Sequence, residues 1–471
     1  MKLLSRSLLF GMGLFTMSAC SEEFLEQTPQ QSLSIENAVE DLVSLRAAVN
    51  GVYNNFQTAN MYGWDLPLIP DLRGDNAYVS FNNAGRFLVF DEYRLTDQSG
   101  RVSGEWNQHY EVIVNTSNII NRFPEATFLS TEMEDANQLL GEAYAQRALT
   151  YWNLLRLFAE PYTNDGGASP GVPITNVGTT GEIVTPARES VAAGYAQVVS
   201  DFQAAIPLMT ENNDGRFTKE AAQALLAKVY LYMEDWSSAE SLASEVIASE
   251  NYSLYAGETE WVSSWGSLGS EDLFAVANAL PDNLGTNSIG GILDQDGYGD
   301  VLATQDLYDA YAESDFRRSM LTPGSRVSGE EDAIFADGKY PEGQRGADYI
   351  RVIRLSDVYL IRAEARAELG DEEGARSDLN AIAQRADTEY DAEDASGEEL
   401  IEAIIEERRK ELAFEGDRVY DLMRRQMTWT KYRNPTLENE EVSWDNAQLI
   451  NPIPRAELDN NPNINENNPG Y

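Results

Sequence analysis

The sequence predicts a mainly α-helical fold, in which a scaffold of tetratricopeptide-like helical repeats carries a loop-rich, irregular region. Three observations lead to this fold class. Apolar residues recur at helical spacing over much of the chain, and one helical-hairpin pattern occurs twice. Two long stretches rich in Gly, Asn, Asp, Ser and aromatic residues have no helical period.

The helical spacing is clearest in three segments whose apolar residues fall every three or four positions. This spacing places them on one face of a helix, which predicts amphipathic helices packed against a common core. The three apolar stripes are Leu42, Leu45, Val49, Val52, Tyr53 and Phe56; Leu140, Tyr144, Ala148, Tyr151, Leu155 and Phe158; and Val191, Tyr195, Val198, Phe202 and Ile206.

The repeated pattern is "AKVYLYMEDWSSAESLASEVI" (227–247), which aligns with "AEARAELGDEEGARSDLNAIA" (363–383) at an offset of 136 residues. Ala227 then matches Ala363, and Asp235 matches Asp371. Small residues where two helices touch, with a short turn between the helices, predict a tetratricopeptide-like hairpin at each place. Repeats of this kind stack into a solenoid.

Residues 58–104 and 250–350 separate these helical units and are predicted to form loops and short strands. Long ordered loops on a rigid scaffold commonly carry function, so candidate binding residues are sought there.

The N-terminus reads as a secretory signal over residues 1–19. Lys2 and Arg6 precede the apolar run "LLFGMGLFTM", which is too short to span a bilayer. The chain's one cysteine, Cys20, follows directly and resembles the lipidated cysteine of a bacterial lipobox. The alternative is an ordinary secretory signal with an incidental cysteine. Residues 20–471 are predicted to form a single domain.

The composition excludes several classes of function. A formal net charge of −44 disfavours nucleic acid, anionic membranes and polyanionic glycans as partners. One Cys and one His cannot build a zinc finger or a multi-histidine metal site. A Ser-His-Asp triad would need His109, which lies on an apolar helical pattern and reads as an ordinary helical histidine.

The segment "SGEELIEAIIEERRKELAFEGDRVYDLMRR" (396–425) is dense in Glu and Arg. Ser396 and Glu399 predict a capping box, and Gly416 marks a break before a second helix near Asp417. The charges suit either a catalytic site or a structural network between helices, and the structural network is favoured.

Part of this segment, "ERRKELAFEGDRVYDLMR" (407–424), resembles the hallmark of the SusD/RagB family of outer-membrane nutrient-binding lipoproteins. "CSEEFLEQTP", "WNQHYEVIVNTSNIINR", "GEAYAQRALTYWNLLRLFAEPY", "LYDAYAESDFRR" and the C-terminal "NPIPRAELDNNPNINENNPGY" resemble family segments in the same order. "SEE" after Cys20 resembles the signal that directs Bacteroidetes lipoproteins to the outer face of the outer membrane.

This resemblance implies a non-catalytic protein at the cell surface. It implies capture of an oligosaccharide or polysaccharide and its delivery to a SusC-like TonB-dependent transporter. The net charge favours a neutral glycan among possible ligands. Peptide capture, as on the RagB side of the family, is the alternative.

A sugar binder needs flat aromatic faces together with polar groups at the ring edge. The two loop-rich regions contain such residues, each of which could instead be a loop anchor packed inward. The predicted ligand-binding residues are Trp64, Asp75, Asn76, Tyr78, Arg86, Trp261, Trp265 and Tyr298. No cofactor is predicted. The stretch "DQDGYGD" (294–300) loosely resembles a calcium loop, but a solvated turn is favoured.

Overall fold

The computed structural model describes residues 39–178, 183–210, 215–326, 330–392 and 394–471. The predicted signal segment 1–19 and Cys20 lie outside these residues. In the described part of the chain, no helix is both long and apolar enough to cross a membrane.

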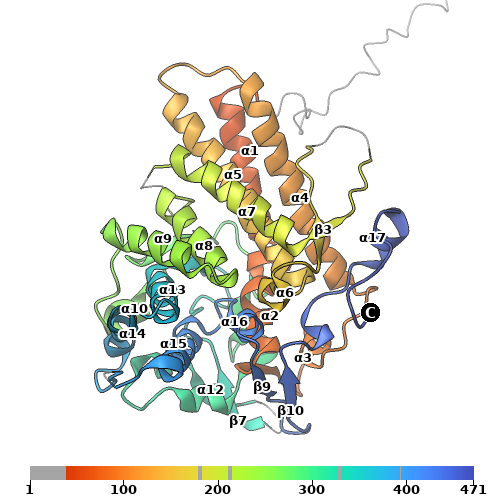
Figure 1. The fold of residues 1–471 in the computed structure, drawn as a ribbon. Coiled ribbons are helices and arrows are strands. Elements are labelled where there is room, and N and C mark those ends of the chain that lie inside the picture. The colour runs from red at the N-terminus through yellow and green to blue at the C-terminus, as the bar shows by residue number, and fades with distance from the viewer. Residues whose placement is uncertain (1–38, 179–182, 211–214, 327–329, 393) are drawn as a thin grey trace, which may run out of the picture.

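Four long helices pack side by side at one end of the molecule (Figure 1). They are α1 (Leu42–Phe56), α4 (Gly100–Arg122), α5 (Met133–Phe158) and α7 (Val191–Ala205). The predicted stripes account for the packing, because Leu45, Val49, Val52 and Phe56 of α1 are all at most 1% exposed. Asp41 begins α1, and its carboxylate accepts a hydrogen bond from the Ser44 backbone in a capping box.

The predicted repeat is confirmed as two helical hairpins. The first pairs α8 (Lys219–Tyr232) with α9 (Trp236–Ala248), and the second pairs α13 (Leu355–Glu368) with α14 (Glu372–Ala386). Asp235 and Asp371 cap the second helix of each hairpin by accepting from the backbone N–H three residues later. The turn before each cap has a positive φ, 59° at Glu234 and 82° at Gly370.

Helix α13 lies at the centre of this stack, in contact with α9, α14 and α15 (Gly397–Leu412). Ser396 is the N-cap of α15, but its side chain makes no cap hydrogen bond, so the predicted capping box is absent. The break at Gly416 is confirmed, since α16 (Arg418–Arg424) follows it. A Cβ at Gly416, whose φ is +92°, would lie 2.5 Å from the Leu66 carbonyl oxygen, so only glycine fits there.

Residues 58–104 are more helical than predicted. A π-helical turn (Ala59–Gly63) leads into α2 (Asp65–Arg73), which is buried along its whole length. The pattern "DLPLIPDLR" hides this helix from sequence reasoning because it contains two prolines and buries its charged residues together with its apolar ones. The remaining short helices are α3 (Leu88–Asp91), α6 (Tyr162–Asp165), α10 (Glu258–Ser264), α11 (Ile289–Leu293), α12 (Gln305–Ala310) and α17 (Arg455–Asn460).

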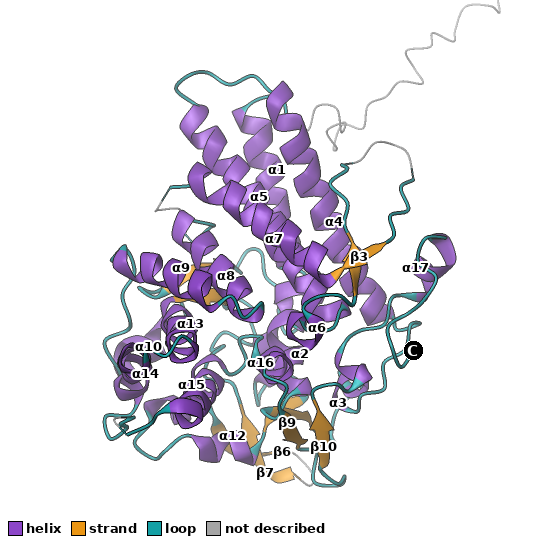
Figure 2. Cartoon of the chain, in the orientation of Figure 1, coloured by secondary structure: helices purple, strands orange, loops and turns teal. Residues whose placement is uncertain are grey.

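The strands are short and form antiparallel pairs, as Figure 2 shows in orange. The pair of β1 (Ala77–Val79) with β5 (Val301–Ala303) joins the two predicted loop regions. The other pairs are β2 (Pro170–Pro173) with β3 (Arg188–Ser190), β4 (Asp272–Val276) with β8 (Ile350–Arg354), β6 (Thr322–Arg326) with β7 (Glu330–Phe335), and β9 (Thr428–Lys431) with β10 (Glu440–Ser443).

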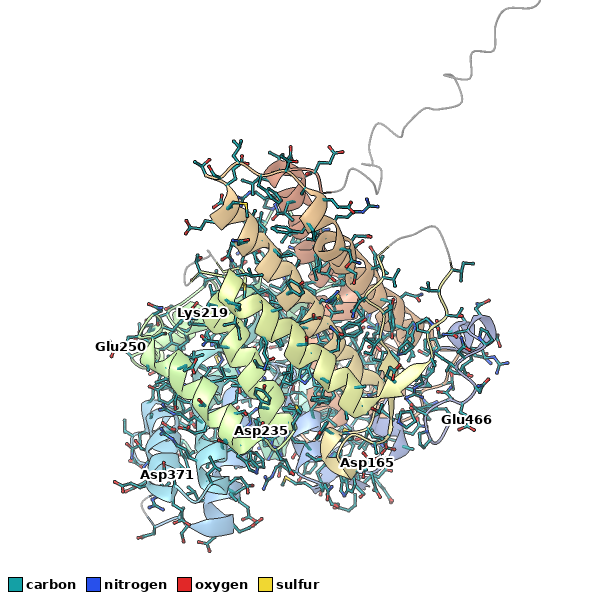
Figure 3. All side chains as sticks on the ribbon, turned by 45° about the horizontal axis from the view of Figure 1, so that its top comes forward. Asp165, Lys219, Asp235, Glu250, Asp371 and Glu466 are labelled. Carbon is teal, nitrogen blue, oxygen red and sulfur yellow. The ribbon has the colours of Figure 1, made fainter. Side chains whose placement is uncertain are left out.

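One hydrophobic cluster runs through most of the described chain and takes residues from the first helix, the loop regions and the C-terminal segment. A smaller cluster lies between α13, α14 and α15. Figure 3 labels several charged side chains at the periphery, among them Asp165, Glu250, Asp371 and Glu466. The predicted fold class, mainly helical with an irregular region, is confirmed. The boundaries of the single predicted domain stay a prediction.

Candidate functional site

Arg86 and Tyr298, which come from the two predicted loop regions, lie against each other. The Arg86 guanidinium carbon is 3.8 Å from the centroid of the Tyr298 ring. Its Nη1 also lies 2.5 Å from Oδ2 of Asp300. Arg326 donates to the backbone oxygens of Tyr298, at 2.9 Å, and of Asn82, at 2.6 Å. We call these five residues the Tyr298 cluster.

The pairing of β1 with β5 brings this cluster together, because Ser80 N donates to Asp300 O immediately beyond the strands. Tyr298 is half-buried, and its hydroxyl donates to Asn287 Oδ1 at 3.2 Å. Arg86 covers one face of the ring, so at most the other face is open to a ligand. An open tyrosine face suits the apolar C–H face of a sugar, and the partly exposed Arg86 guanidinium can donate to its hydroxyls.

Tyr78, on β1, lines a cavity of about 560 Å³ that we call the Tyr78 cavity. This volume is within the range of about 300–1,000 Å³ typical of small-molecule sites. Tyr432 lies on its wall and donates its hydroxyl to Asp306 Oδ1 at 3.0 Å. The lining residues are Tyr78, Ala303, Thr304, Gln305, Asp332, Ile334, Tyr432, Arg433, Pro435, Leu437, Glu438 and Asn439.

Asp75 and Asn76 lie behind this cavity and are buried. Arg418 donates to both carboxylate oxygens of Asp75 at 2.7 Å. Arg409 donates to Asn76 Oδ1 at 2.8 Å and to Asp306 Oδ2 at 2.6 Å. The side chains of these two predicted residues are therefore engaged in internal pairs. Their backbone oxygens accept hydrogen bonds from Thr304, which lines the cavity.

The charge state of Asp75 follows from these contacts. Burial alone would raise its pKa, but Arg418 and then Arg409 lower it to about 2. The Asp75 carboxylate is thus ionised at neutral pH and holds the two arginines behind the cavity. Its position supports a structural contribution, with no surface left for direct contact with a ligand.

Trp261 and Trp265 were predicted as sugar platforms, but both are buried, at 0% and 1% exposed. Their rings meet edge to face with centroids 5.4 Å apart, and they pack with Tyr255 and Met320 in a small core cluster. The guanidinium of Arg351 lies 4.2 Å from the Trp265 ring centroid. No ring face is available to a ligand from solvent, so we leave both residues out of the proposed site.

Trp64 is half-buried and also packs inward. Its ring meets Phe87 edge-on at 5.7 Å, and the Arg101 guanidinium lies 5.2 Å from its centroid. The loop-anchor interpretation therefore fits Trp64 better than the platform interpretation.

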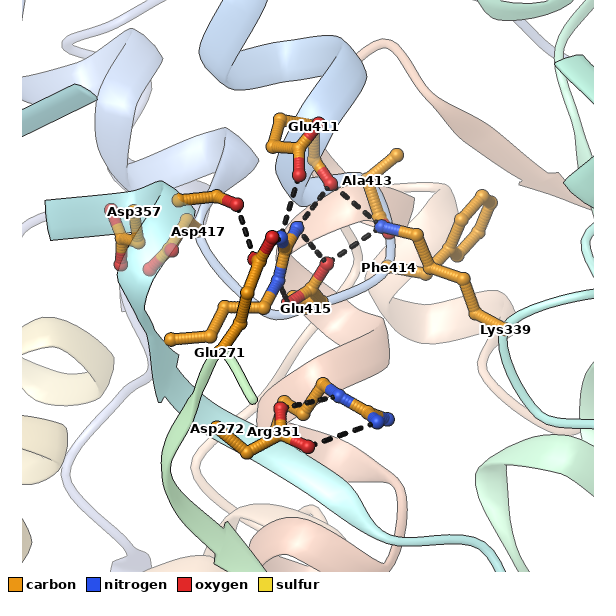
Figure 4. Close-up of polar contacts among 12 residues, drawn as sticks. Glu271, Asp272, Lys339, Arg351, Asp357, Glu411, Ala413, Phe414, Glu415 and Asp417 are labelled. Atoms are coloured by element: carbon orange, nitrogen blue, oxygen red, sulfur yellow. Dashed lines mark hydrogen bonds and ion pairs between the residues drawn. The ribbon is translucent and has the colours of Figure 1, made fainter. Parts of the chain in front are cut away.

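The charged hallmark segment forms a buried ionic network, as predicted, and Figure 4 shows its centre. Arg354 donates to Glu411 Oε1 at 2.6 Å and to Glu415 Oε2 at 2.8 Å. Lys339 Nζ donates to Glu415 Oε1 at 2.6 Å, and Arg317 donates to Glu411 Oε2 at 2.6 Å. All five side chains are at most 6% exposed, so they join α15 to the irregular region and face away from solvent.

His109 is confirmed as a helical histidine on α4, fully buried. Its Nδ1 lies 2.6 Å from the Glu105 backbone oxygen, and burial lowers its pKa to about 4. Its Nε2 has no hydrogen-bond partner among the described residues. The geometry of a catalytic triad is thus not present around this ring in the described part of the chain.

The calcium-like loop is held by its own contacts. Asp294 Oδ1 accepts from Asp296 N at 2.8 Å, and Asp300 pairs with Arg86. Across the described residues, no three His, Cys, Asp or Glu side chains are grouped so that they could hold a metal ion.

Sequence reasoning missed Tyr432 and Arg326. Arg326 lies on strand β6 and Tyr432 directly follows β9, and both contact residues far away in the sequence: Tyr432 contacts Asp306, and Arg326 contacts Tyr298 and Asn82. Their only signal in the sequence was an aromatic or basic residue in a non-helical stretch, which many other residues share.

Two family models match the chain. The model described as "SusD family" matches residues 327–471, and the model described as "Starch-binding associating with outer membrane" matches residues 23–231. A chain of Formosa agariphila named SusD-like protein P2 is 28% identical over 510 residues, which cover 97% of this chain and 98% of that protein.

Solved structures resemble it over nearly the whole length. A putative sugar binding protein from Bacteroides vulgatus is 31% identical with a TM-score of 0.84, covering 92% of this chain and 99% of that chain. A SusD superfamily protein from Bacteroides thetaiotaomicron is 29% identical with a TM-score of 0.84, covering 91% of this chain and 100% of that chain. The resemblance expected from the hallmark segment is confirmed, and the chain belongs to the SusD family.

Proposed function

We propose that this chain is a surface-exposed lipoprotein of the outer membrane that binds a neutral oligosaccharide or polysaccharide. It delivers this ligand to a SusC-like TonB-dependent transporter. The observation that carries the proposal is the 31% identity, over 92% of this chain, to a protein described as sugar-binding. Capture of peptides, as by RagB-like members, is the alternative function.

The Tyr298 cluster and the neighbouring Tyr78 cavity support a sugar ligand. The half-buried Tyr298 ring offers an apolar face, and the partly exposed Arg86 guanidinium can donate to hydroxyls. Asp300 is buried and holds Arg86 in place. The cavity adds Tyr78 and Tyr432. Trp64, Asp75 and Asn76 would then hold the surrounding structure.

The expected affinity is weak, and weak binding suits delivery. If one ring face buries about 100 Å² of apolar surface, it contributes about 2.5 kcal/mol. Two or three such rings barely exceed the several kcal/mol that association costs. The dissociation constant should therefore lie in the micromolar to millimolar range, from which a ligand is easily released to the transporter.

Attachment to the membrane would run through Cys20. A diacylglycerol on its sulfur, with a further acyl chain on its amine, would supply the two or more chains that stable anchoring needs. Residues 20–471 would form one domain held outside the cell by this anchor.

Isothermal titration tests the ligand class with maltoheptaose, xylohexaose, short fructo-oligosaccharides and tetra-alanine. At least one glycan should bind, and Tyr298→Ala should weaken its binding roughly 10- to 100-fold, the equivalent of one lost ring platform. Tyr308→Ala is the matched control, because Tyr308 is also half-buried and carries an arginine, Arg318, 4.3 Å from its ring centroid. Heat with tetra-alanine and none with any glycan would establish the peptide alternative.

Binding without cleavage is part of the proposal, in line with relatives described as sugar-binding. Incubation of the purified chain with the glycan that binds should release no new reducing ends. Their appearance would overturn the non-catalytic assignment.

A further inference from the structure

A second pocket, of about 350 Å³, lies beside the C-terminal half of α1, and we call it the α1 pocket. It shares no lining residue with the Tyr78 cavity or the Tyr298 cluster. Its walls come from α1, the segment after α7, the end of β4 and the turn before β8. The lining residues are Asn50, Tyr53, Asn54, Gln57, Gly215, Arg216, Leu268, Ala275, Val276, Ala277, Asp282 and Tyr349.

The α1 wall of this pocket is polar but uncharged. Asn50, Tyr53, Asn54 and Gln57 lie at positions i, i+3, i+4 and i+7, which places them on one face of the helix. Elsewhere the surface is strongly acidic, since the chain carries 78 acidic and 34 basic residues. This wall presents a row of carboxamides and a phenol in place of carboxylates. Such groups suit sugar hydroxyls, because a carboxamide can both donate a hydrogen bond to a hydroxyl and accept one from it.

Arg216 is fixed at the base of this wall. Its Nε and Nη2 donate to Glu142 Oε2 at 3.0 and 2.6 Å, and its Nη1 donates to Asn50 Oδ1 at 2.9 Å. The guanidinium carbon lies 4.7 Å from the Tyr53 ring centroid. Tyr53 is fixed as well, because its hydroxyl donates to Glu142 at 2.8 Å and accepts from Phe217 N at 3.1 Å. These groups would lose little freedom when a ligand binds.

Three other polar groups on the lining have no internal hydrogen-bond or ionic partner within the described residues. They are the Asn54 carboxamide, the Tyr349 hydroxyl and the Asp282 carboxylate. Asn55, the neighbour of Asn54 on α1, differs in that its side chain donates to Glu111 at 3.3 Å, away from the pocket. The lining thus pairs unengaged polar groups with apolar surface from Leu268, Ala275 and Val276.

We propose that the α1 pocket is a second binding site for uncharged oligosaccharide, separate from the Tyr298 cluster. This proposal rests on the proposed function, because both sites would take the same class of ligand. Sugar C–H faces would contact Tyr349, Leu268 and Ala277, while hydroxyls would bond to the carboxamides.

The charges of the pocket argue against an anionic ligand. Glu142 already neutralises Arg216, and Asp282 presents a carboxylate that no lysine or arginine among the described residues pairs with. An anion would therefore meet net repulsion, whereas a neutral sugar can donate a hydroxyl to Asp282.

Two variants remove the site while leaving the buried contacts intact. The double variant Asn54→Ala/Tyr349→Ala deletes two side-chain groups that have no internal partner. Ala277→Phe fills the pocket instead. Ala277 is exposed, and its backbone oxygen accepts from the Gln57 side chain at 2.5 Å, a bond that the substitution leaves in place. Asn55→Ala is the matched control on the same helix. Thermal unfolding of each variant checks that the fold is retained.

Isothermal titration and equilibrium dialysis with the same glycans then measure affinity and stoichiometry. The wild-type chain should bind two oligosaccharides, and each α1-pocket variant should bind one, with at least a tenfold loss of affinity at the lost site. Asn55→Ala should still bind two. Arg86→Ala/Tyr298→Ala should retain the α1-pocket site alone.

The outcomes separate this proposal from the proposed function. If the wild-type chain binds a glycan and both α1-pocket variants keep its stoichiometry and affinities, the second site is refuted and the proposed function stands. If the wild-type chain binds none of the glycans, the proposed function fails and this proposal fails with it. Tetra-alanine that binds the wild type and is lost in both variants would assign the pocket to peptides and overturn the sugar site.

Discussion

Removing Arg424 should destabilise the protein far more than removing an arginine from its surface. Arg424, on α16, donates to both carboxylate oxygens of Glu364, on α13, at 2.6 and 2.7 Å. Glu364 is 0% exposed. Once Arg424 is gone, the nearest cation left to Glu364 is Arg425, whose Nη1 lies 3.6 Å away. The variant Arg424→Met therefore leaves the buried Glu364 carboxylate with one distant partner. Asp421 also loses Arg424, which donates to it at 2.8 Å, but it keeps Arg408 at 3.1 Å.

The size of the effect follows from this isolation. Breaking a buried ion pair by removing one partner costs about 3–5 kcal/mol, because the remaining charge is buried without compensation. Neutralising that charge by Glu364→Gln in the same chain should recover part of the loss. The double variant should then be no less stable than Arg424→Met alone, a coupling of at least about 2 kcal/mol.

Urea unfolding, followed in parallel by tryptophan fluorescence and circular dichroism, measures the three variants against wild type. The control is Arg46→Met, because Arg46 pairs with Asp135 at a similar 3.0 Å but with side chains 46% and 62% exposed. That variant should change stability by no more than about 1 kcal/mol. A loss below about 1 kcal/mol for Arg424→Met, or costs of the two single variants that simply add, would refute the reasoning.

Four further predictions concern charge, backbone and the lipid anchor. Burial would raise the pKa of Glu415, but Arg354 and Lys339 lower it to about 2. The Glu415 carboxylate therefore stabilises the fold above about pH 4.5, and this stabilisation is lost as the pH falls toward 2. The difference in melting temperature between wild type and Glu415→Gln should close over that range. Burial raises the pKa of Asp348 to about 7. The contribution of its protonated carboxyl to folding stability is therefore lost as the pH rises from about 4 through 7. The melting temperature of Asp348→Asn should rise relative to that of wild type across the same range. Glu234→Gly should stabilise by about 0.5–1 kcal/mol in urea unfolding, because a glutamate at φ 59° is strained where glycine is not. Cys20→Ala should abolish incorporation of radiolabelled palmitate and release the chain from membranes, and labelled Cys20→Ala would contradict the anchor.

The helical part of the fold could be predicted because its signals are local. Each stripe lies on one helix, and burial of that face needs no knowledge of the partner. The repeat was equally readable, since Ala239 and Ala375 meet the neighbouring helix in the same way and both are 0% exposed. Helix α2 escaped prediction because it has two prolines and is buried on all sides, its charged residues included, so no exposed polar face gives it a helical period.

The candidate binding residues were less predictable because their burial depends on distant partners. Two tryptophans four residues apart fit an exposed sugar platform as well as they fit a buried packing cluster. Whether Trp265 faces solvent is decided by Arg351, which covers it from β8. Likewise Asp75 looks like a ligand contact until Arg418, 343 residues later, engages its carboxylate. Arg86 and Tyr298 remain in the proposed site because the pairing of β1 with β5 brings their two loops together.

The distribution of charge links the interior of the protein to its proposed ligand. Buried carboxylates need partners, and at least twelve of the 34 lysines and arginines are buried among them. The remaining cations are outnumbered by acidic residues, since the chain has a formal net charge of −44, and the acidic surface would repel anionic ligands at a distance. On that surface the Tyr298 cluster and the α1 pocket present rings and amides beside Arg86 and Arg216, whose charges are matched by Asp300 and Glu142. A neutral, hydroxyl-rich ligand is the class that gains contacts at both places without paying for uncompensated charge.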